Sequence, residues 1–322
     1  MKGQPRVVAH ADWGKSPDKR WLARAVLDSR GRYVARAPEP VVDAPMLLRR
    51  LLASDGDGGA IFVGFDFPIG LPGAYAERAA IDDFLAVFPQ FGEGDWAQFY
   101  DVATCAGEIG LRRPFYPARP GGTTRAHLVA GLGLASVGEL LRACDRAHAS
   151  RHAAAPIFWT LGAQQVGKGA IAGWREVLAP ALRAADPDVA IWPFSGRLRD
   201  LFRPSRVVIA ETYPAECYAH LGVDLRRGAT NGRSGKRWAP SRAANAGTLL
   251  TWARAAGVVL SPPLVAAIED GFGTSASGED QFDTVVGLLG MLNVLLGGRA
   301  PGEPEDERVR HIEGWILGQA RS

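Results

Sequence analysis

Residues 60–65 (AIFVGF) form an unbroken apolar run that ends at Asp66, with Pro68 and Gly70 close behind it. A short apolar run bounded by breakers is typical of a strand covered on both faces, and such strands belong mainly to parallel sheets flanked by helices. The run therefore predicts an α/β protein. Because 47% of the residues are hydrophobic and 22% are charged, the chain can bury the core that this fold class needs.

Three further strands are predicted before this run and one after it. Residues 6–12 (RVVAHAD) predict the first strand, and residues 21–27 and 33–36 flank a DSRGR turn and predict an antiparallel hairpin. Residues 207–213 (VVIAETY) predict the last strand, which Pro214 ends. Helices are expected from Pro45 to the breakers at 54–59, at residues 215–221, 243–256 and 277–296, and around Val309, Ile312 and Ile316.

The segment from residue 71 to residue 204 has a different pattern from the rest of the chain. It contains helical pieces interrupted by Gly and Pro, with one short strand candidate at residues 157–161. A chain of 322 residues exceeds the usual size of a single domain and has room for an inserted subdomain. We therefore expect a core made of residues 1–70 and 205–322, and a mainly helical insertion or cap subdomain over residues 71–204.

Carboxylates stand at the ends of the predicted strands and in the late apolar helix. Strand exits border the crevice where open α/β sheets bind their ligands, and two Asp three residues apart share one face of a helix. Hard cations such as Mg²⁺ or Mn²⁺ prefer oxygen ligands, and one or two of them would suit such a group. The candidate residues are Asp12, Asp66, Glu211, Asp280 and Asp283.

Most of these acids also have a local explanation. Asp12 and Asp66 precede turns, where Asp often bonds nearby backbone, and Glu211 can pair with a core arginine. Asp280 has the capping-box spacing from Ser277, so it can serve only to hold the start of a helix. Asp283 lies beyond that first turn and is followed by apolar residues, where an unpaired carboxylate costs on the order of several kcal/mol. Asp283 is therefore the acid that most needs a function.

Five blocks follow one another along the chain: a strand ending in Asp12, a hairpin, FVGFDFPIGLP at 62–72, ETYPAE at 211–216 and EDQFD at 279–283. In this order the chain resembles the domain-of-unknown-function 429 family, whose members are described as predicted nucleases of the RNase H fold. The late D-x-x-D pair is also similar to that of Holliday-junction resolvases, which share this superfamily's fold. The resemblance implies an RNase H-like mixed sheet flanked by helices, with the helical insertion between its parts.

The same resemblance implies a function and assigns roles. Asp12 would be the metal ligand on the first strand, Asp66 the ligand on the fourth strand, and Asp280 and Asp283 the ligands on the helix. Glu211 fits a family block, and we include it among the catalytic residues, although the resolvase pattern does not use its strand. The implied activity is Mg²⁺- or Mn²⁺-dependent hydrolysis of phosphodiester bonds in DNA or RNA.

Two other functions stay open. Gly162, Gly167 and Lys168 match the G-x-x-x-x-G-K part of a phosphate-binding loop, but Gly169 stands where such a loop needs Ser or Thr. An ATP-using enzyme of this P-loop-like kind, or of an actin-like kind that uses the Asp12 loop, is one alternative. A catalytically silent nucleic-acid-binding protein is the other.

The stretch between Asp224 and Glu269 has no acid, and its first part places six cations around Trp238, amid Gly and Ser. Such a loop can contact phosphates and stack a base, although a solvated Arg-rich surface has the same composition. The pattern recurs between residues 112 and 125, where four Arg alternate with Phe115 and Tyr116. The candidate nucleic-acid-binding residues are Arg226, Arg227, Arg233, Lys236, Arg237, Trp238 and Arg242.

Net charge, cysteine spacing and the longest apolar run limit the binding partners and the cellular compartment that we expect for this protein. The net charge of +3 is too small for a general polyanion binder, so contacts to nucleic acid must come from local clusters. The three cysteines are far apart and predict neither a zinc site nor a disulfide framework, which favours a reducing cytoplasm. The apolar run at residues 285–296 is too short to span a bilayer, and we expect no membrane partner. Nothing indicates an oligomeric state.

Overall fold

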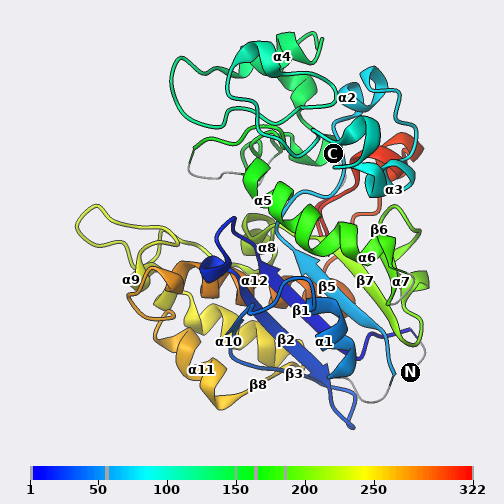
Figure 1. Ribbon diagram of the computed structural model, residues 1–322. Coiled ribbons are helices and arrows are strands. Elements are labelled where there is room, and N and C mark those ends of the chain that lie inside the picture. Colours follow the sequence, from blue (N-terminus) through cyan, green and yellow to red (C-terminus); the bar gives the residue numbers. More distant parts are fainter. Residues whose placement is uncertain (1–2, 55–57, 149–150, 163–165, 185–186, 321–322) are drawn as a thin grey trace.

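The computed structural model describes residues 3–54, 58–148, 151–162, 166–184 and 187–320. Within these residues, the fold is α/β with one mixed sheet of eight strands flanked by helices (Figure 1). The strands are β1 (Val7–Asp12), β2 (Trp21–Leu27), β3 (Tyr33–Ala35), β4 (Glu39–Pro40), β5 (Ile61–Phe65), β6 (Asp188–Trp192), β7 (Arg206–Glu211) and β8 (Val259–Leu260).

The strand order is β6-β7-β5-β1-β2-β3-β8, with β4 beside β2. Strands β1, β5, β7 and β6 run parallel to one another, whereas β2 is antiparallel to both β1 and β3. Strand β8 adds a short parallel edge to β3. The predicted first strand, hairpin and two buried apolar strands are therefore confirmed. The sheet is mixed because β2, the first strand of the hairpin, runs opposite to its neighbours.

The helices surround this sheet on both faces and extend away from one end of it. They are α1 (Leu47–Ala53), α2 (Gly73–Arg78), α3 (Phe84–Val87), α4 (Arg125–Gly131), α5 (Val166–Gly173), α6 (Ala179–Arg183), α7 (Leu198–Leu201), α8 (Pro214–Leu221), α9 (Ala239–Ala243), α10 (Ala246–Ala255), α11 (Pro262–Glu269) and α12 (Ser277–Leu295). The described residues also form two π-helical turns, at Trp174–Leu178 and Val309–Glu313. The 3₁₀ turns are Pro17–Lys19, Phe88–Gln90, Gly94–Trp96, Ala106–Glu108, Val137–Leu140 and Ala143–Asp145.

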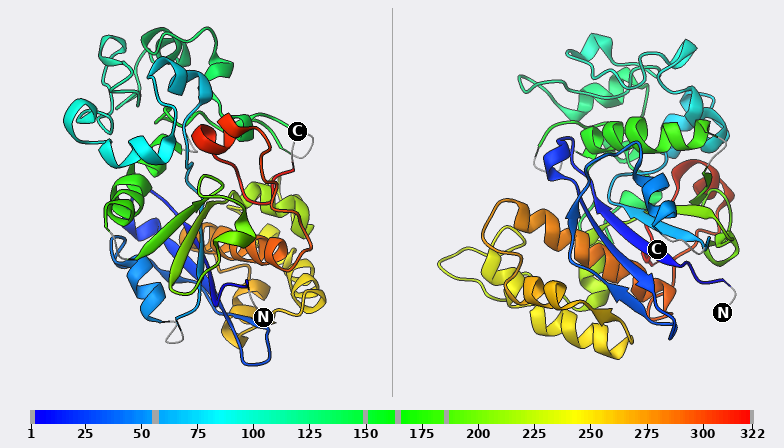
Figure 2. Two further views of the ribbon diagram at one scale, coloured as in Figure 1. Left: turned by 90° about the vertical axis from the view of Figure 1, so that its right-hand side faces the viewer. Right: turned by 60° about the horizontal axis from the view of Figure 1, so that its bottom comes forward.

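Each face of the sheet has its own apolar core. Helices α8, α10, α11 and α12 cover one face, where Phe62 and Val208 of the strands are buried against them (Figure 2). On the other face, α1 and the helical rod made of α5, the π turn and α6 pack on Val63 and Ile209. Alternation of side chains along the strands explains this division, because successive residues point to opposite faces.

Helix α12 lies against the sheet more closely than a helix with ordinary side chains allows. A Cβ atom at Gly287 would lie 2.2 Å from Cε1 of His10 on β1, and one at Gly290 would lie 2.3 Å from Sγ of Cys217 on α8. Both distances are far inside van der Waals contact, so only glycine fits at these two positions. The late apolar helix was predicted over residues 277–296 and is confirmed; its close approach depends on these glycines.

The predicted division into core and insertion differs from the structure at two places. Strand β6 lies inside the expected insertion, but it pairs with β7 and forms an edge of the sheet. The C-terminal segment was placed in the core, yet the Leu71 amide donates to the Ile312 carbonyl and Ile312 is buried among insertion side chains. Figure 2 shows this segment, in red, between the sheet and the insertion.

Three local predictions also differ. Residues 157–161 form no strand and make only one bridge, between Tyr116 and Trp159. The expected helix at 243–256 is α10, which begins only at Ala246, and the short α9 lies in the segment expected to be a loop. The C-terminal helix is a single π turn that Gly314 ends with a φ of 70°. Among the residues that the structure describes, no helix is long and apolar enough to cross a membrane.

The contact between α12 and β1 predicts the effect of adding a single methyl group. We expect Gly287→Ala to lower the free energy of unfolding by about 1–3 kcal/mol or more, because the new Cβ collides with the buried His10 ring. The matched control is Gly247→Ala, in an exposed turn of α10 with no atom within 4 Å of the new Cβ. That control should raise the free energy by about 0.5–1 kcal/mol. Urea denaturation followed by circular dichroism measures both, and equal stabilities would contradict this packing.

Candidate metal centre

The ends of β1 and β5 place two carboxylates side by side. Ala11 and Phe65 are register partners in these parallel strands, and Asp12 and Asp66 are the next residue on each. The backbone amide of Trp13 donates to Oδ1 of Asp66 at 2.7 Å, which ties the two strand exits together. The two carboxyl groups are close enough that each shifts the pKa of the other. The predicted proximity of Asp12 and Asp66 is therefore confirmed.

Helix α12 adds Asp283 to the same edge of the sheet. Only 3% of this residue is exposed. The Tyr218 hydroxyl of α8 donates to its Oδ1, and the Lys236 ammonium donates to its Oδ2 at 2.6 Å. Asp280 lies one turn earlier on the same helix and is half-buried. We refer to Asp12, Asp66, Asp280 and Asp283 as the acidic group.

Burial and mutual repulsion make the charged forms of these acids costly. Burial first, and then the nearby Asp66 and Asp283 carboxylates, raise the pKa of Asp12 well above its ordinary value. Burial raises the pKa of Asp66 to about 6, and burial with the neighbouring Glu279 raises that of Asp280 to about 6. Burial also raises the pKa of Asp283, against the opposing effect of Lys236. Such a set of destabilised carboxylates favours a bound cation.

The donor set fits a hard divalent cation. All four residues offer oxygen, the ligand that Mg²⁺ and Mn²⁺ prefer. Within the described ranges their oxygens do not form a triple with all atoms within 4.8 Å of one another. The acidic group is therefore wider than a compact site in which three ligand atoms surround one ion.

The local explanations for two of these acids do not apply. The N-cap of α12 is Ala276 and receives no side-chain hydrogen bond, so Asp280 is not a capping residue. Asp66 accepts its hydrogen bond from Trp13, 53 residues away, and not from its own turn. The Asp66 carboxylate is therefore held by tertiary structure.

Arg20 positions the loop that follows Asp12. Its side chain is 2% exposed, and its guanidinium donates to the Gly14 carbonyl at 2.9 Å and to Glu176 of the helical rod at 3.0 Å. The same guanidinium lies 4.5 Å from the centre of the Trp13 ring. Arg20 thus anchors the Trp13 backbone that bonds Asp66. Sequence reasoning missed this residue, because one arginine among 32 carries no distinguishing pattern.

His10 is a structural residue at the edge of this site. Its Nδ1 lies 3.1 Å from the Thr284 carbonyl and its Nε2 lies 2.8 Å from the Thr212 hydroxyl. Because a carbonyl can only accept, Nδ1 carries the proton and Nε2 accepts from Thr212. Burial lowers the pKa of His10 to about 3, so the ring is neutral. His10 is therefore a buried, hydrogen-bonded histidine.

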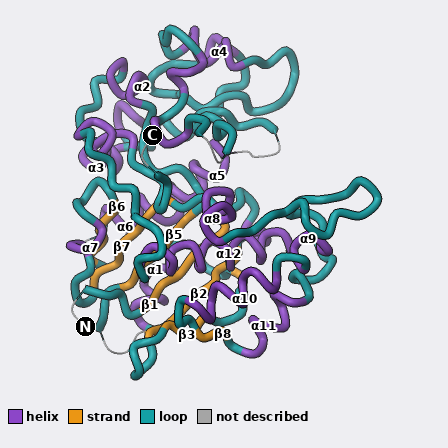
Figure 3. The backbone as a smooth tube through the Cα atoms, turned by 180° about the vertical axis from the view of Figure 1, so that it is seen from behind, coloured by secondary structure: helices purple, strands orange, loops and turns teal. Residues whose placement is uncertain are grey.

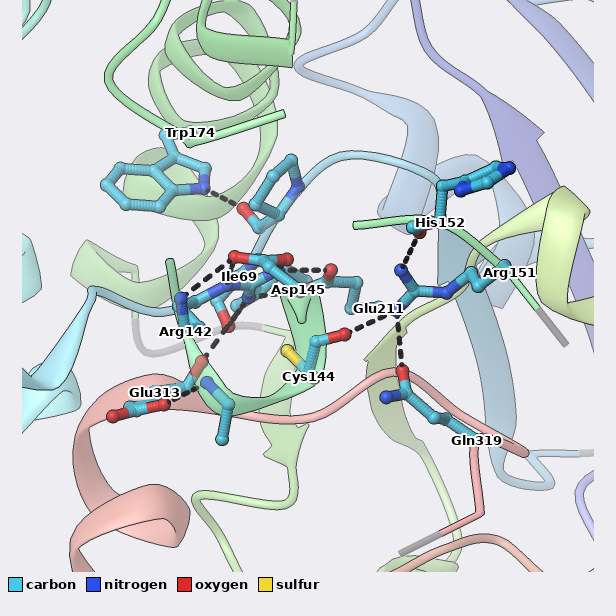
Figure 4. Close-up of polar contacts among 12 residues, drawn as sticks. Ile69, Arg142, Cys144, Asp145, Arg151, His152, Trp174, Glu211, Glu313 and Gln319 are labelled. Atoms are coloured by element: carbon cyan, nitrogen blue, oxygen red, sulfur yellow. Dashed lines mark hydrogen bonds and ion pairs between the residues drawn. The ribbon is translucent and has the colours of Figure 1, made fainter. Parts of the chain in front are cut away.

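Glu211, predicted to act with the four aspartates, faces the other side of the sheet. Its register partner is Phe65, so its side chain alternates with that of Asp66. Arg142 donates to its two carboxylate oxygens, both at 2.6 Å, and the Ile69 amide donates to it at 2.6 Å (Figure 4). Glu211 is therefore a core carboxylate paired with an arginine and does not join the acidic group.

Arg142 also explains a second group of potential metal ligands. Ligand atoms of Cys144, Asp145 and Glu211 lie within 4.8 Å of one another, a spacing that could hold a metal ion. However, the buried Arg142 guanidinium also bonds both oxygens of Asp145, at 2.9 and 3.0 Å. Burial raises the pKa of the Cys144 thiol well above its ordinary value, so the thiol stays protonated. The Arg142 guanidinium neutralises the two carboxylates of this group.

The predicted basic loop protrudes from the molecule between α8 and α9 (Figure 3). Arg226, Arg227, Arg233 and Arg237 are exposed, and the Arg233 guanidinium lies 5.5 Å from the centre of the Trp238 ring. Arg226 pairs with Asp224 at 3.0 Å, and Arg227 donates to Thr248. These contacts are all on the surface, so the arginines remain accessible to phosphates.

Two residues that were predicted to bind nucleic acid, Lys236 and Arg242, do not lie on the exposed surface of the basic loop. Arg242 is 2% exposed and donates to the carbonyls of Gly271, Gly273 and Lys236, so it supports the loop from inside. It is not available to a ligand, and its assignment to the nucleic-acid interface is corrected. Lys236 points back toward the acidic group.

The second basic stretch and the phosphate-loop pattern are less open than expected. Phe115 and Tyr116 are buried, and the Arg112 guanidinium lies over the Trp96 ring at 3.6 Å, so no exposed aromatic is interleaved there. Residues 163–165 of the glycine-rich pattern lie outside the described residues. Gly167 and Lys168 already belong to α5, where a Cβ on Gly167 would lie 2.6 Å from the Ile157 carbonyl oxygen.

Comparison of the chain with protein-family models, with curated proteins and with solved structures found no match. Function is therefore inferred from the chemistry of the acidic group and its surroundings. The acidic group combines four carboxylates from two strand exits and one helix with a single contacting ammonium among the described residues, that of Lys236.

The raised pKa of Asp66 predicts how stability changes with pH in metal-free buffer. Because the folded pKa of about 6 exceeds the ordinary value of 3.8, the unfolded chain loses this proton first as pH rises. Native stability from this group is therefore lost between about pH 4 and pH 6. Asp66→Asn should become more stable relative to wild type across this window, by on the order of 1 kcal/mol. The exposed Asp82→Asn is the control, and parallel curves for all three proteins would contradict the pKa assignment.

Proposed function

We propose that the protein is a Mg²⁺- or Mn²⁺-dependent nuclease with an RNase H-like core, as its resemblance to the domain-of-unknown-function 429 family implies. The observation that carries the proposal is the pairing of Asp12 and Asp66 at neighbouring strand exits with Asp283 arriving from α12. Leaving aside the two-residue β4, β1 and β5 are the first and fourth strands along the chain. These are the strands that the resemblance expects to carry metal ligands.

Two of the proposed ligands accept hydrogen bonds from other parts of the chain. The Trp13 amide fixes Asp66, and the Tyr218 hydroxyl fixes Asp283. Arg20 in turn fixes the loop that carries Trp13. Ions held by these carboxylates would supply Lewis acidity that lowers the pKa of water and stabilises charge on a leaving oxygen. The chain itself provides a rigid arrangement that does not have to reorganise during the reaction.

The distribution of lysine supports a phosphate-bearing substrate. The chain has 32 Arg and only five Lys, and two of those five, Lys19 and Lys236, act on carboxylates of the acidic group. Lys15 and Lys19 follow Asp12 in the loop before β2, and Lys19 acts on the pKa of Asp280. Lys168 lies in α5 beside Gly169, where a Cβ would contact the Trp13 carbonyl. Compact ammonium groups on flexible stems suit phosphate neutralisation.

The decisive experiment removes single ligands and measures cleavage. We expect Asp12→Asn and Asp283→Asn to lower Mn²⁺-dependent hydrolysis of DNA or RNA by about 100-fold to 1,000-fold, because each change removes a preorganised charge at the reacting centre. Asp82→Asn, an exposed aspartate of the insertion, should retain full activity.

Single-stranded, duplex and branched substrates should all be tested with the three variants. If wild type and both ligand variants are equally inactive on every substrate, the protein is a silent binder and the nuclease proposal is wrong. ATP turnover that needs Lys15 or Lys168 would instead support the ATP-using alternative.

The exposed arginines of the basic loop predict a salt effect on nucleic-acid binding. Each phosphate neutralised contributes about 0.7–0.9 to the slope of log affinity against log salt. Replacing Arg226, Arg227 and Arg233 together with Gln should flatten that slope by about two units without changing sequence preference. Trp238→Ala should weaken single-stranded ligands most, since stacking needs an accessible base face. An unchanged slope would show that the loop is ordinary solvated surface.

A further inference from the structure

Lys236 is the cation that the structure places in contact with the acidic group. Its ammonium lies 2.6 Å from Oδ2 of Asp283 and 3.1 Å from Oε1 of Glu279. The two partners differ greatly in exposure, because 43% of the Lys236 side chain but only 4% of the Asp283 side chain is accessible. The ammonium therefore reaches a buried carboxylate from the solvent side and can leave without unfolding the core.

The backbone around Lys236 is held in place although its side chain is accessible. The buried Arg242 donates to the Lys236 carbonyl, and the Gly235 amide donates to the Leu225 carbonyl at 3.0 Å, which closes the base of the loop. Arg237, the next residue, pairs with Glu279 at 3.2 Å. A side-chain rotation about this fixed backbone would move the ammonium while keeping it next to the acidic group.

Each carboxylate oxygen of Asp283 already has a partner. Its Oδ1 accepts from Tyr218 and its Oδ2 accepts from Lys236. A divalent cation that takes Asp283 as a ligand must compete with the Lys236 ammonium for a buried carboxylate. An ammonium released from Asp283 would keep Glu279 as a partner and would lie beside the site where we propose that a phosphate binds.

We infer that Lys236 exchanges partners during the reaction cycle: it is the counter-ion of Asp283 before metal binds, and a substrate-phosphate contact afterwards. This inference rests on the proposed nuclease function. It makes Lys236 a substrate-positioning residue. Its ammonium can contact a substrate phosphate only after metal ions have displaced it from Asp283. A phosphodiester of DNA or RNA is the ligand class that such an ammonium recognises.

Calorimetric titration with Mn²⁺ alone tests the first half of the exchange. Lys236→Met keeps the aliphatic stem but removes the competing charge, so it should bind Mn²⁺ about tenfold more tightly than wild type. Arg227→Met is the matched control, because it removes one charge from the same loop and its guanidinium donates to Thr248 rather than to Asp283. It should bind Mn²⁺ as wild type does.

The possible results separate the inference from the proposed function. Equal Mn²⁺ affinity in wild type and Lys236→Met would overturn the role of Lys236 and leave the nuclease proposal standing. Absence of Mn²⁺ binding in all three proteins would overturn both. Circular dichroism of Lys236→Met, together with the variant Lys236→Arg, guards against a folding defect: the arginine variant should bind Mn²⁺ no more tightly than wild type.

Fluorescence anisotropy with a labelled oligonucleotide tests the second half. In EDTA, wild type and Lys236→Met should bind with the same salt slope, because Lys236 is then committed to Asp283. With Ca²⁺, which prefers the same oxygen ligands, the wild-type slope should exceed that of the variant by about 0.7–0.9. An equal deficit of the variant in EDTA would show that Lys236 contacts phosphate without metal, and the exchange of partners would be wrong.

Discussion

The contact between helix α12 and strand β1 sets where the carboxylates of this protein lie. Gly287 rests directly on the His10 ring, and a methyl group there would lie 2.2 Å from it. The neutral imidazole donates to Thr284 of α12 and accepts from Thr212 after β7. The buried His10 side chain thus connects β1 with helix α12 and with the end of β7.

The position of the acidic group follows from this contact. Asp283 immediately precedes Thr284 on α12, and Asp12 lies two residues after His10 on β1. When the helix seats on the strand, these two acids reach the same edge of the sheet, where Asp66 already adjoins Asp12. Any change that lifts α12 from β1 would therefore separate the proposed metal ligands as well as weaken the core.

The protein neutralises its buried acids in two different ways. Glu211 is bonded by Arg142, a fully buried guanidinium that also holds Asp145 and cannot leave without breaking the core. Asp283 is bonded by Lys236, a partly exposed ammonium on a flexible stem. A planar guanidinium gives a permanent bidentate pair, whereas an ammonium gives a point contact that a metal ion can replace. The choice of cation distinguishes the structural acid from the acids that we propose to be functional.

Sequence patterns predicted an element correctly where it is buried on both sides and its apolar residues fit one kind of structure. They failed for short apolar runs, which fit more than one kind of structure. Strand β5 and helix α12 were predicted correctly, and Asp283 was singled out because an apolar helix offers no local partner for a carboxylate. Residues 157–161 were expected to form a strand, but a short apolar run fits a buried loop equally well. Strand β6 was missed because it is one short run within residues 71–204, which were interpreted as a helical insertion.

The sequence by itself determined which acids end strands and which lie in the buried helix, because these facts depend only on the local period of apolar residues. Only the tertiary structure decided which of these acids meet. Asp66 and Glu211 both stand at strand exits, but the register that pairs Phe65 with Glu211 turns the two side chains to opposite faces of the sheet. Their partners, Trp13 and Arg142, are 53 and 69 residues away in the chain. Register and distant packing arise from the association of whole elements, and no local pattern encodes them.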